Sequence, residues 1–233
     1  MKRIVYTYVL AMLISFSNIA NAQKIIEKIY PVTSDDEISL DFKFADEIKI
    51  TSWDKNEVYI KATVNINDNK DNDKFTLNLK QRSIGIKIES EIEDLDDIHK
   101  SRRIIKKEDE GRTIIYDCSV NMDLYFEVIV PKNNKLEIET ISGDIDIDGV
   151  MARMYINTIS GFIDLSLPVN CDADLELSTI TGGMYSDFDF NREKNDGYYH
   201  YGKNELSKRI NNGGTRIFLE TISGDIFIRK ARQ

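Results

Sequence analysis

Four near-copies of one seven-residue string constrain the fold of this chain more than any other feature. The copies are Glu139-Thr-Ile-Ser-Gly-Asp-Ile145, Asn157-Thr-Ile-Ser-Gly-Phe-Ile163, Ser178-Thr-Ile-Thr-Gly-Gly-Met184 and Glu220-Thr-Ile-Ser-Gly-Asp-Ile226. They are offset by 18, 21 and 42 residues, and apolar residues alternate with polar ones around each copy. Periods near 20 residues are typical of solenoids, in which every turn of the chain stacks on its neighbour. We therefore predict a solenoid of about four or five rungs, with its regular repeats over residues 136–230.

Each position of the repeat predicts a place in such a stack. The glycine allows a corner with positive φ or a close approach of two backbones. The threonines predict a ladder, and the isoleucines that follow them predict an internal apolar column in which one alanine substitution costs roughly 2–5 kcal/mol. The glycines are Gly143, Gly161, Gly182 and Gly224, the threonines are Thr140, Thr158, Thr179 and Thr221, and the isoleucines are Ile141, Ile159, Ile180 and Ile222. Asp144 and Asp225 occupy matching corners and are expected to be at least three rungs apart.

The rest of the chain also predicts strands. Period-two alternation recurs from residue 36 onward, as in Val58 to Ile66 and Val120 to Val130, and it is typical of half-buried strands. No window has a convincing helical apolar face. We predict an all-β fold in which antiparallel strands towards the N-terminus lead into the solenoid. The aromatic-rich residues 186–214 interrupt the repeat, either as one irregular rung or as an excursion from the solenoid.

The N-terminus resembles an export signal. Lys2 and Arg3 precede an apolar stretch from Ile4 to Phe16, and the small residues Ala20 and Ala22 frame a cleavage site. We predict a signal peptide over residues 1–22 and one mature domain over residues 23–233, in the periplasm, at the outer-membrane surface or secreted, without a transmembrane segment.

Export would bring the two cysteines of the chain into an oxidising compartment. Cys118 and Cys171 alternate in phase with apolar residues, so both are expected to face the core. They could pair after export. The repeat register places them in different rungs, which favours two free thiols.

The repeats resemble the putative-adhesin domain family, as do the segments from Ile50 to Val58 and from Gly213 to Ile228. The members of that family are exported proteins of unknown function related to the head domains of auto-transporter adhesins. The resemblance is dense over residues 128–230 and implies a β-helical, right-handed fold. It carries no set of catalytic residues. Phe162 and Gly183 depart from the repeat by replacing the aspartate after the glycine, which puts a shared role for that aspartate in doubt.

Few residues form a pattern that is typical of a catalytic or ligand-binding site. Asp146 and Asp164 occupy equivalent outward positions in neighbouring copies, with an expected separation of about 5 Å that suits a retaining glycosidase pair or a shared cation. A solvated acidic strand face is the alternative. Tyr198, Tyr199 and Tyr201 are candidates for stacking on sugar rings, with capping of the solenoid end as the alternative. No motif indicates a metal site or a cofactor.

The composition limits the classes of partner that the protein is expected to bind. The formal net charge of −9 opposes nucleic acid or an anionic membrane as a partner, because both select clustered positive charge. We predict an exported, non-catalytic envelope protein that binds an unknown surface ligand, a glycan or a protein. The alternatives are a carbohydrate-active β-helix enzyme that uses the outward carboxylates, and a periplasmic structural or envelope-stress component.

Overall fold

The computed structural model describes residues 23–95, 120–189 and 203–231, together with the backbone of residues 108–109, 112–113 and 199–200. Within these residues the protein is all-β, as predicted, apart from one short 3-10 turn, η1 (Asn72–Lys74). Sixteen strands form one hydrogen-bonded sheet, and β7 (Glu108–Asp109) and β8 (Arg112–Thr113) form a separate pair.

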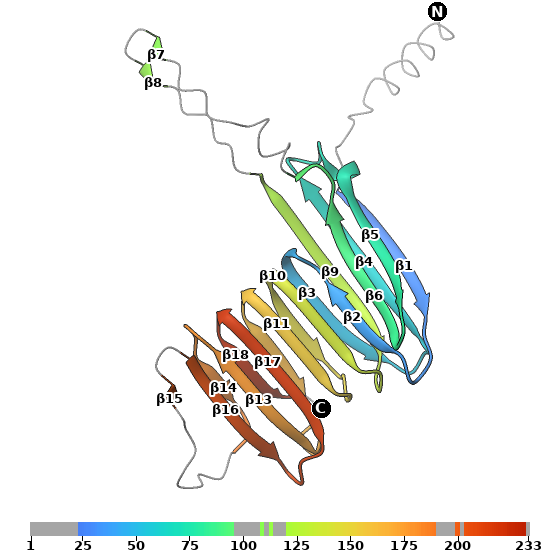
Figure 1. Ribbon diagram of the computed structural model, residues 1–233, viewed down its shortest axis with the longest axis vertical. Coiled ribbons are helices and arrows are strands. Elements are labelled where there is room, and N and C mark those ends of the chain that lie inside the picture. The colour runs from blue at the N-terminus through green and yellow to red at the C-terminus, as the bar shows by residue number, and fades with distance from the viewer. Residues whose placement is uncertain are drawn as a thin grey trace, which may run out of the picture.

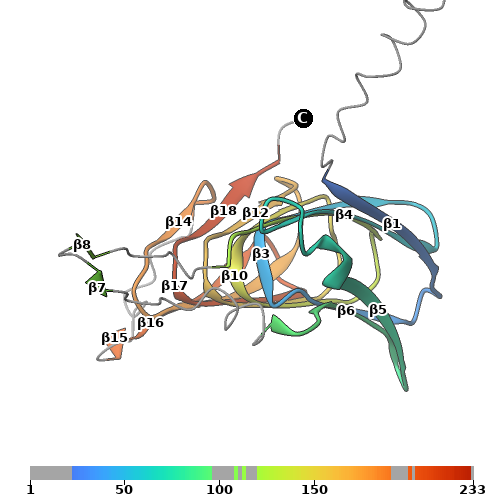
Figure 2. The same cartoon turned by 90° about the horizontal axis from the view of Figure 1, so that it is seen from above.

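The large sheet folds over on itself into two layers (Figure 2). The fold-over occurs within β10 (Leu136–Asp148), whose first half pairs in one layer and whose second half pairs in the other. The first layer contains β6 (Gly85–Ile92), β2 (Glu37–Asp41), β11 (Met154–Ser160), β17 (Thr215–Ser223) and β13 (Ala173–Thr179). The second layer contains β9 (Met122–Pro131), β3 (Phe44–Trp53), β12 (Ile163–Leu167), β18 (Ile226–Lys230) and β14 (Met184–Ser186).

Strands from the two layers combine into parallel rungs, and in each rung except β6/β9, whose strands are joined through residues outside the described ranges, the chain turns one corner between them. The described residues form six of them, in the spatial order β6/β9, β2/β3, β10, β11/β12, β17/β18 and β13/β14. Two rungs therefore come from the N-terminal half, which was expected to supply antiparallel strands alone, and the stack exceeds the predicted four or five rungs. Figure 1 shows the rungs of β10, β11, β17 and β13 one after another down the molecule.

The rungs do not stack in chain order. The last repeat copy, in β17 and β18, lies between the two copies that precede it, because β17 pairs with both β11 and β13. Asp225 is therefore two rungs from Asp144, and the prediction of at least three was wrong. The offset of 42 residues reflects this return of the chain and does not mark a skipped rung.

Antiparallel strands flank the stack at both ends. At one end β4 (Glu57–Ile66) pairs with β9, β1 (Lys24–Pro31) pairs with β4, and β5 (Phe75–Arg82) pairs with β6. At the other end β16 (Lys203–Ile210), with the two-residue β15 (Tyr199–His200), pairs with β13. The interruption of the repeat is thus an excursion: β16 covers the edge of β13, and a turn at residues 211–214 crosses back to begin β17.

The corner glycines are explained by the closeness of the rungs. A Cβ atom built on Gly161, whose φ is +137°, would lie 2.2 Å from the carbonyl oxygen of Gly143. A Cβ on Gly224 would lie 2.0 Å from the carbonyl of Gly161, and one on Gly182 would lie 1.8 Å from the carbonyl of Gly224. No side chain fits such an approach, so this position of the repeat accepts glycine alone.

The threonine ladder is confirmed, and it lies inside the stack. Thr140, Thr158, Thr221 and Thr179 are paired in this order on successive rungs and are all buried. Their hydroxyls find partners on backbone carbonyls: Thr221 Oγ1 donates to Gly161 at 3.2 Å, and Thr179 Oγ1 donates to Gly224 at 3.0 Å. A buried hydroxyl must be paired in this way to avoid a desolvation penalty.

The isoleucine column is not internal, and that prediction was wrong. Ile141, Ile159, Ile180 and Ile222 are 42%, 45%, 42% and 43% exposed. The physical reason is the period of two along a strand: Thr158 shares the inward face of Met154 and Ile156, so Ile159 must point outward. The four side chains form an exposed isoleucine ridge along the corner.

The one cysteine among the described residues is Cys171, which is buried and free. Burial raises the pKa of its thiol. Cys118 lies outside the described residues.

These facings give a direct stability test. Ile163→Ala removes a fully buried side chain from β12 and should lower the free energy of unfolding by roughly 2–5 kcal/mol. Ile159→Ala, four residues earlier on the outward side of the corner, should lower it by about 1 kcal/mol or less. Urea titration of both variants checks the assignment, and a larger loss for Ile159→Ala would contradict the facing of β11.

Candidate functional site

The outward face of the second layer brings the two predicted carboxylates together. Asp146 on β10 and Asp164 on β12 are directly opposite each other on neighbouring parallel strands, and both alternate with buried residues as expected. The same row continues to Lys49 on β3 on one side and to Phe227 on β18 on the other. Both carboxylates are half-buried on this face.

Arg229 distinguishes the two carboxylates. Its Nε donates to both oxygens of Asp164, at 2.8 Å and 2.6 Å, so Asp164 is held as part of an ion pair. Asp146 has no such partner among the described residues, and its pKa is raised above the ordinary value, first by burial and then by the like charge of Asp164, while Lys49 opposes the shift. One carboxylate of the pair is therefore neutralised by a cation, and the other retains a proton to higher pH than an ordinary aspartate.

Aromatic side chains adjoin this pair. Phe162 and Phe227 meet edge to face with ring centroids 6.2 Å apart, and Tyr185 stacks on Phe227 at 5.2 Å. The guanidinium of Arg229 lies 5.0 Å from the centre of the Phe227 ring. A shallow hollow of about 600 Å³ is lined by Phe162, Asp164, Phe227, Arg229 and the corner residues beside them. Flat rings beside fixed charges suit a ligand with both apolar and polar faces.

The aspartate that follows the corner glycine has a structural role. Asp144 accepts a hydrogen bond from the backbone N–H of Phe162 at 3.1 Å, and Asp225 accepts one from the N–H of Gly183 at 2.7 Å. In space the rungs with this aspartate alternate with the rungs that lack it. Each carboxylate thus accepts a hydrogen bond from a backbone N–H of the neighbouring rung, and no two of these carboxylates lie on adjacent rungs. The departures at Phe162 and Gly183 are part of this arrangement.

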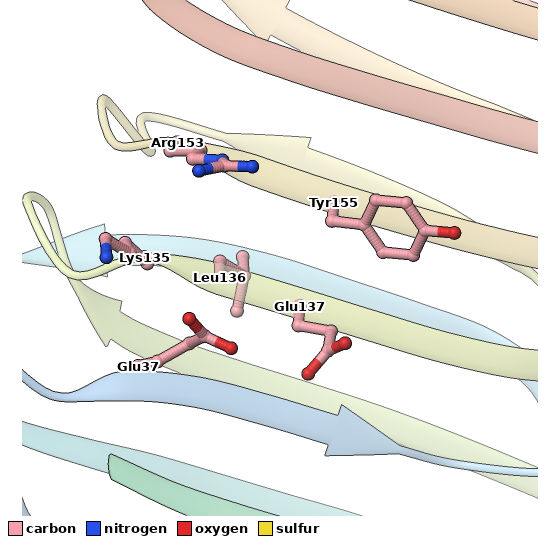
Figure 3. Close-up of a pocket in the computed structure, with 6 residues that line it drawn as sticks. All are labelled: Glu37, Lys135, Leu136, Glu137, Arg153 and Tyr155. Carbon is pink, nitrogen blue, oxygen red and sulfur yellow. The ribbon is translucent and has the colours of Figure 1, made fainter. Parts of the chain in front are cut away.

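A second pocket lies on the outward face of the first layer, near the start of β10. It has a volume of about 280 Å³ and is lined by Glu37, Lys135, Leu136, Glu137, Arg153 and Tyr155. Figure 3 shows the carboxylates of Glu37 and Glu137 on the side of β2, with the guanidinium of Arg153 and the phenol of Tyr155 on the side of β11. Glu137 also pairs with Arg82, with 3.0 Å between Oε2 and NH1.

The predicted tyrosines are not placed. Tyr198 and Tyr201 lie outside the described residues, and for Tyr199 only the backbone is described, in β15. No group of three or more His, Cys, Asp or Glu side chains that could hold a metal ion occurs in the described part of the chain.

Sequence reasoning missed Arg229 and the aromatic cluster of Phe162, Phe227 and Tyr185. One signal was available for Phe227, which occupies in the last copy the repeat position of Asp146 and Asp164. The contact of Arg229 with Asp164 depends on β18 lying next to β12, and that order of rungs is not visible in the sequence.

Taken together, the fold and these faces define a class of protein: a stacked, parallel β-structure whose core lies between two layers and whose outer faces present ordered rows of side chains. A family model, Toastrack DUF4097, matches residues 95–229, which is more than half of the chain. The protein belongs to the Toastrack DUF4097 family. No match was found among proteins with curated descriptions.

The chain is similar to several solved structures, and the first of them shares its fold. A putative cell adhesion protein from Clostridium sporogenes matches with a TM-score of 0.54 at 11% identity, over 90% of this chain and 100% of that one. A putative adhesin from Parabacteroides merdae matches 70% of this chain and 69% of its own, with 10% identity and a TM-score of 0.24. Another from Bacteroides fragilis matches 89% of this chain and 97% of its own, with 10% identity and a TM-score of 0.23.

The raised pKa of Asp146 predicts a pH effect on stability. The native state binds this proton more tightly than the unfolded chain, so ionisation of Asp146 destabilises the fold increasingly as the pH rises above about 3.9, the ordinary aspartate value. Asp146→Asn removes that ionisation. Its Tm should exceed the wild-type Tm at neutral pH, and the difference should disappear near pH 3, below the ordinary pKa of about 3.9.

Thermal unfolding across this pH range measures the effect. Asp54→Asn is the matched control, because Asp54 has an 85% exposed side chain and lies at a distant turn. An Asp146→Asn variant that is less stable than wild type at neutral pH would show that the carboxylate is required in its charged form.

Proposed function

We propose that this protein is an exported, non-catalytic binding scaffold of the cell envelope, of the adhesin type. One observation carries the proposal. The inward side chains of both layers pack in the core, whereas the outward side chains form rows in which exposed aromatic rings lie beside charged groups. Stacked repeats commonly use such extended faces for binding. The shared fold with a putative cell adhesion protein supports the same class.

Export is the second part of the proposal. The predicted signal peptide ends at Ala22, and β1 begins at Lys24, so removal of residues 1–22 would take nothing from the described strands. We propose residues 23–233 as the mature domain. No helix among the described residues is long and apolar enough to cross a membrane. The family resemblance supports two further proposals, right-handed winding of the stack and kinship with the head domains of auto-transporter adhesins.

Localisation in the native host tests this function. We expect a mature N-terminus at Gln23 by mass spectrometry, and loss of the protein when intact cells are treated with a protease. A periplasmic marker protein, which must survive the same treatment, is the control. Survival of the mature protein together with that marker would favour the periplasmic structural or envelope-stress role, and an unprocessed N-terminus would contradict export.

A second function is favoured by a specific observation, the unequal pair of Asp146 and Asp164. Asp146, whose pKa is raised, lies beside Asp164, which is ion-paired with Arg229, and glycoside hydrolysis uses two carboxyl groups in unequal environments as an acid and its partner. A screen on a panel of polysaccharides separates this enzyme from a binding scaffold. Hydrolysis that is abolished by Asp146→Asn would establish the enzyme, and binding without hydrolysis would support the scaffold.

A further inference from the structure

A row of basic side chains crosses the outward face of the first layer. Lys135, Arg153 and Arg216 occupy equivalent positions on three successive rungs, directly before the buried residues Leu136, Met154 and Ile217, which are paired in register. All three side chains are exposed. We refer to these three residues as the basic row. The rungs of a parallel sheet are ~4.8 Å apart, so the charges recur at about this interval.

No salt bridge among the described residues joins Lys135, Arg153 or Arg216 to a carboxylate. Two carboxylates nevertheless adjoin the ends of the basic row, because Glu37 lines a pocket with Lys135 and Asp174 is paired in register with Arg216. Asp174 also holds Arg209, with 3.1 Å between Nε and Oδ1. In a chain with a net charge of −9, three cations on successive rungs are a local exception. Their charge is complementary to a ligand with regularly spaced anionic groups.

Aromatic rings adjoin the basic row. Tyr155, which is 40% exposed, lies beside Phe218 with ring centroids 6.4 Å apart. The guanidinium of Arg153 lies 5.8 Å from the centre of the Phe218 ring, so it is held near the surface of the sheet. The pocket of Figure 3 opens beside them and has a volume on the scale of a single sugar ring. Such rings offer a flat apolar platform for the C–H face of a sugar.

The carboxylates around the basic row help to distinguish a nucleic acid from an acidic polysaccharide as the anionic ligand. Glu37 and Glu137 line the pocket with Lys135 and Arg153, and Glu139 and Glu220 lie one outward position further along their strands. Phosphodiester groups of a nucleic acid would be repelled by these carboxylates and offer them no protons. Sugar hydroxyls donate hydrogen bonds to carboxylates. The mixture of cations, carboxylates and rings therefore matches a ligand that is rich in hydroxyls and also anionic.

We infer that the face formed by the basic row, Tyr155 and Phe218 binds an extended acidic polysaccharide, with uronate carboxylates on Lys135, Arg153 and Arg216 and sugar rings on the aromatic pair. The distance between rungs is close to the length of one sugar in such a chain, so successive cations meet successive sugars. This inference rests on the proposed function and names its ligand class. It uses the layer opposite to the one that carries Asp146 and Asp164.

Calorimetric titration of the mature protein with oligogalacturonate tests the inference. Wild-type protein should bind the oligomer, and the affinity should fall as salt is added. Arg153→Gln with Arg216→Gln should weaken binding by at least about tenfold, because each arginine supplies a charge-assisted hydrogen bond. The methyl-esterified oligomer, which lacks the charges, should bind wild type no better than the charged oligomer binds this double variant.

The matched control is Lys55→Gln with Lys70→Gln, which removes the same charge at two exposed lysines away from the row, with side chains 64% and 67% exposed. This control should change the dissociation constant by no more than about twofold, and circular dichroism should verify that both double variants are folded. Absence of binding by wild type, equal binding by the arginine variant, or equal affinity for single-stranded DNA would overturn the inference. None of these results alters the localisation experiment, so the proposed function stands or fails separately.

Discussion

The close approach of successive rungs at their corner is the constraint on which the rest of the structure depends. The backbone of Gly161 lies against the carbonyl of Gly143, and Gly224 in turn lies against Gly161, at distances that exclude any side chain. Backbone hydrogen bonds join the rungs at these corners, as from the N–H of Gly161 to the carbonyl of Ser223 at 3.1 Å, and so fix the register on both sides. The buried threonines tie the same corners together through their hydroxyls. The spacing between side chains in every row on the two faces follows from this column of corner glycines.

That spacing also sets the electrostatics of the outer faces. Equivalent residues of neighbouring rungs lie side by side, so a charged residue that recurs in the repeat lies next to a residue of like charge. The corner aspartates avoid this by alternating in space, while Asp146 and Asp164 do meet and are relieved by Lys49 and Arg229. The basic row is the opposite case, in which three like charges are adjacent and none of them forms a salt bridge with a described residue. A stack of this kind supports a row of like charges because the backbone hydrogen bonds and the core outweigh the repulsion.

Much of the architecture could be predicted from the repeat, because it records which residues share a position. The all-β class, the threonine ladder, the glycine corner and the outward pair Asp146 and Asp164 follow from periods of two and of about twenty residues. The facing of Ile159 was predicted wrongly because an apolar residue that recurs at one position of the repeat was expected to be buried, whereas the inward position belongs to Thr158. The order of the rungs could not be predicted, because no local pattern indicates that β17 passes between β11 and β13. Arg229 and the basic row depend on that order.

The position of the last strands has a consequence for how the chain matures. β17 and β18 fill an interior rung, and their partners β11 and β12 are about 60 residues earlier in the chain. A nascent chain that emerges N-terminus first therefore cannot complete the sheet between β11 and β13 until β17 and β18 have followed. Up to that moment β11 and β13 present unpaired edges. This order of assembly delays completion of the core until strands about 60 residues further along the chain have emerged.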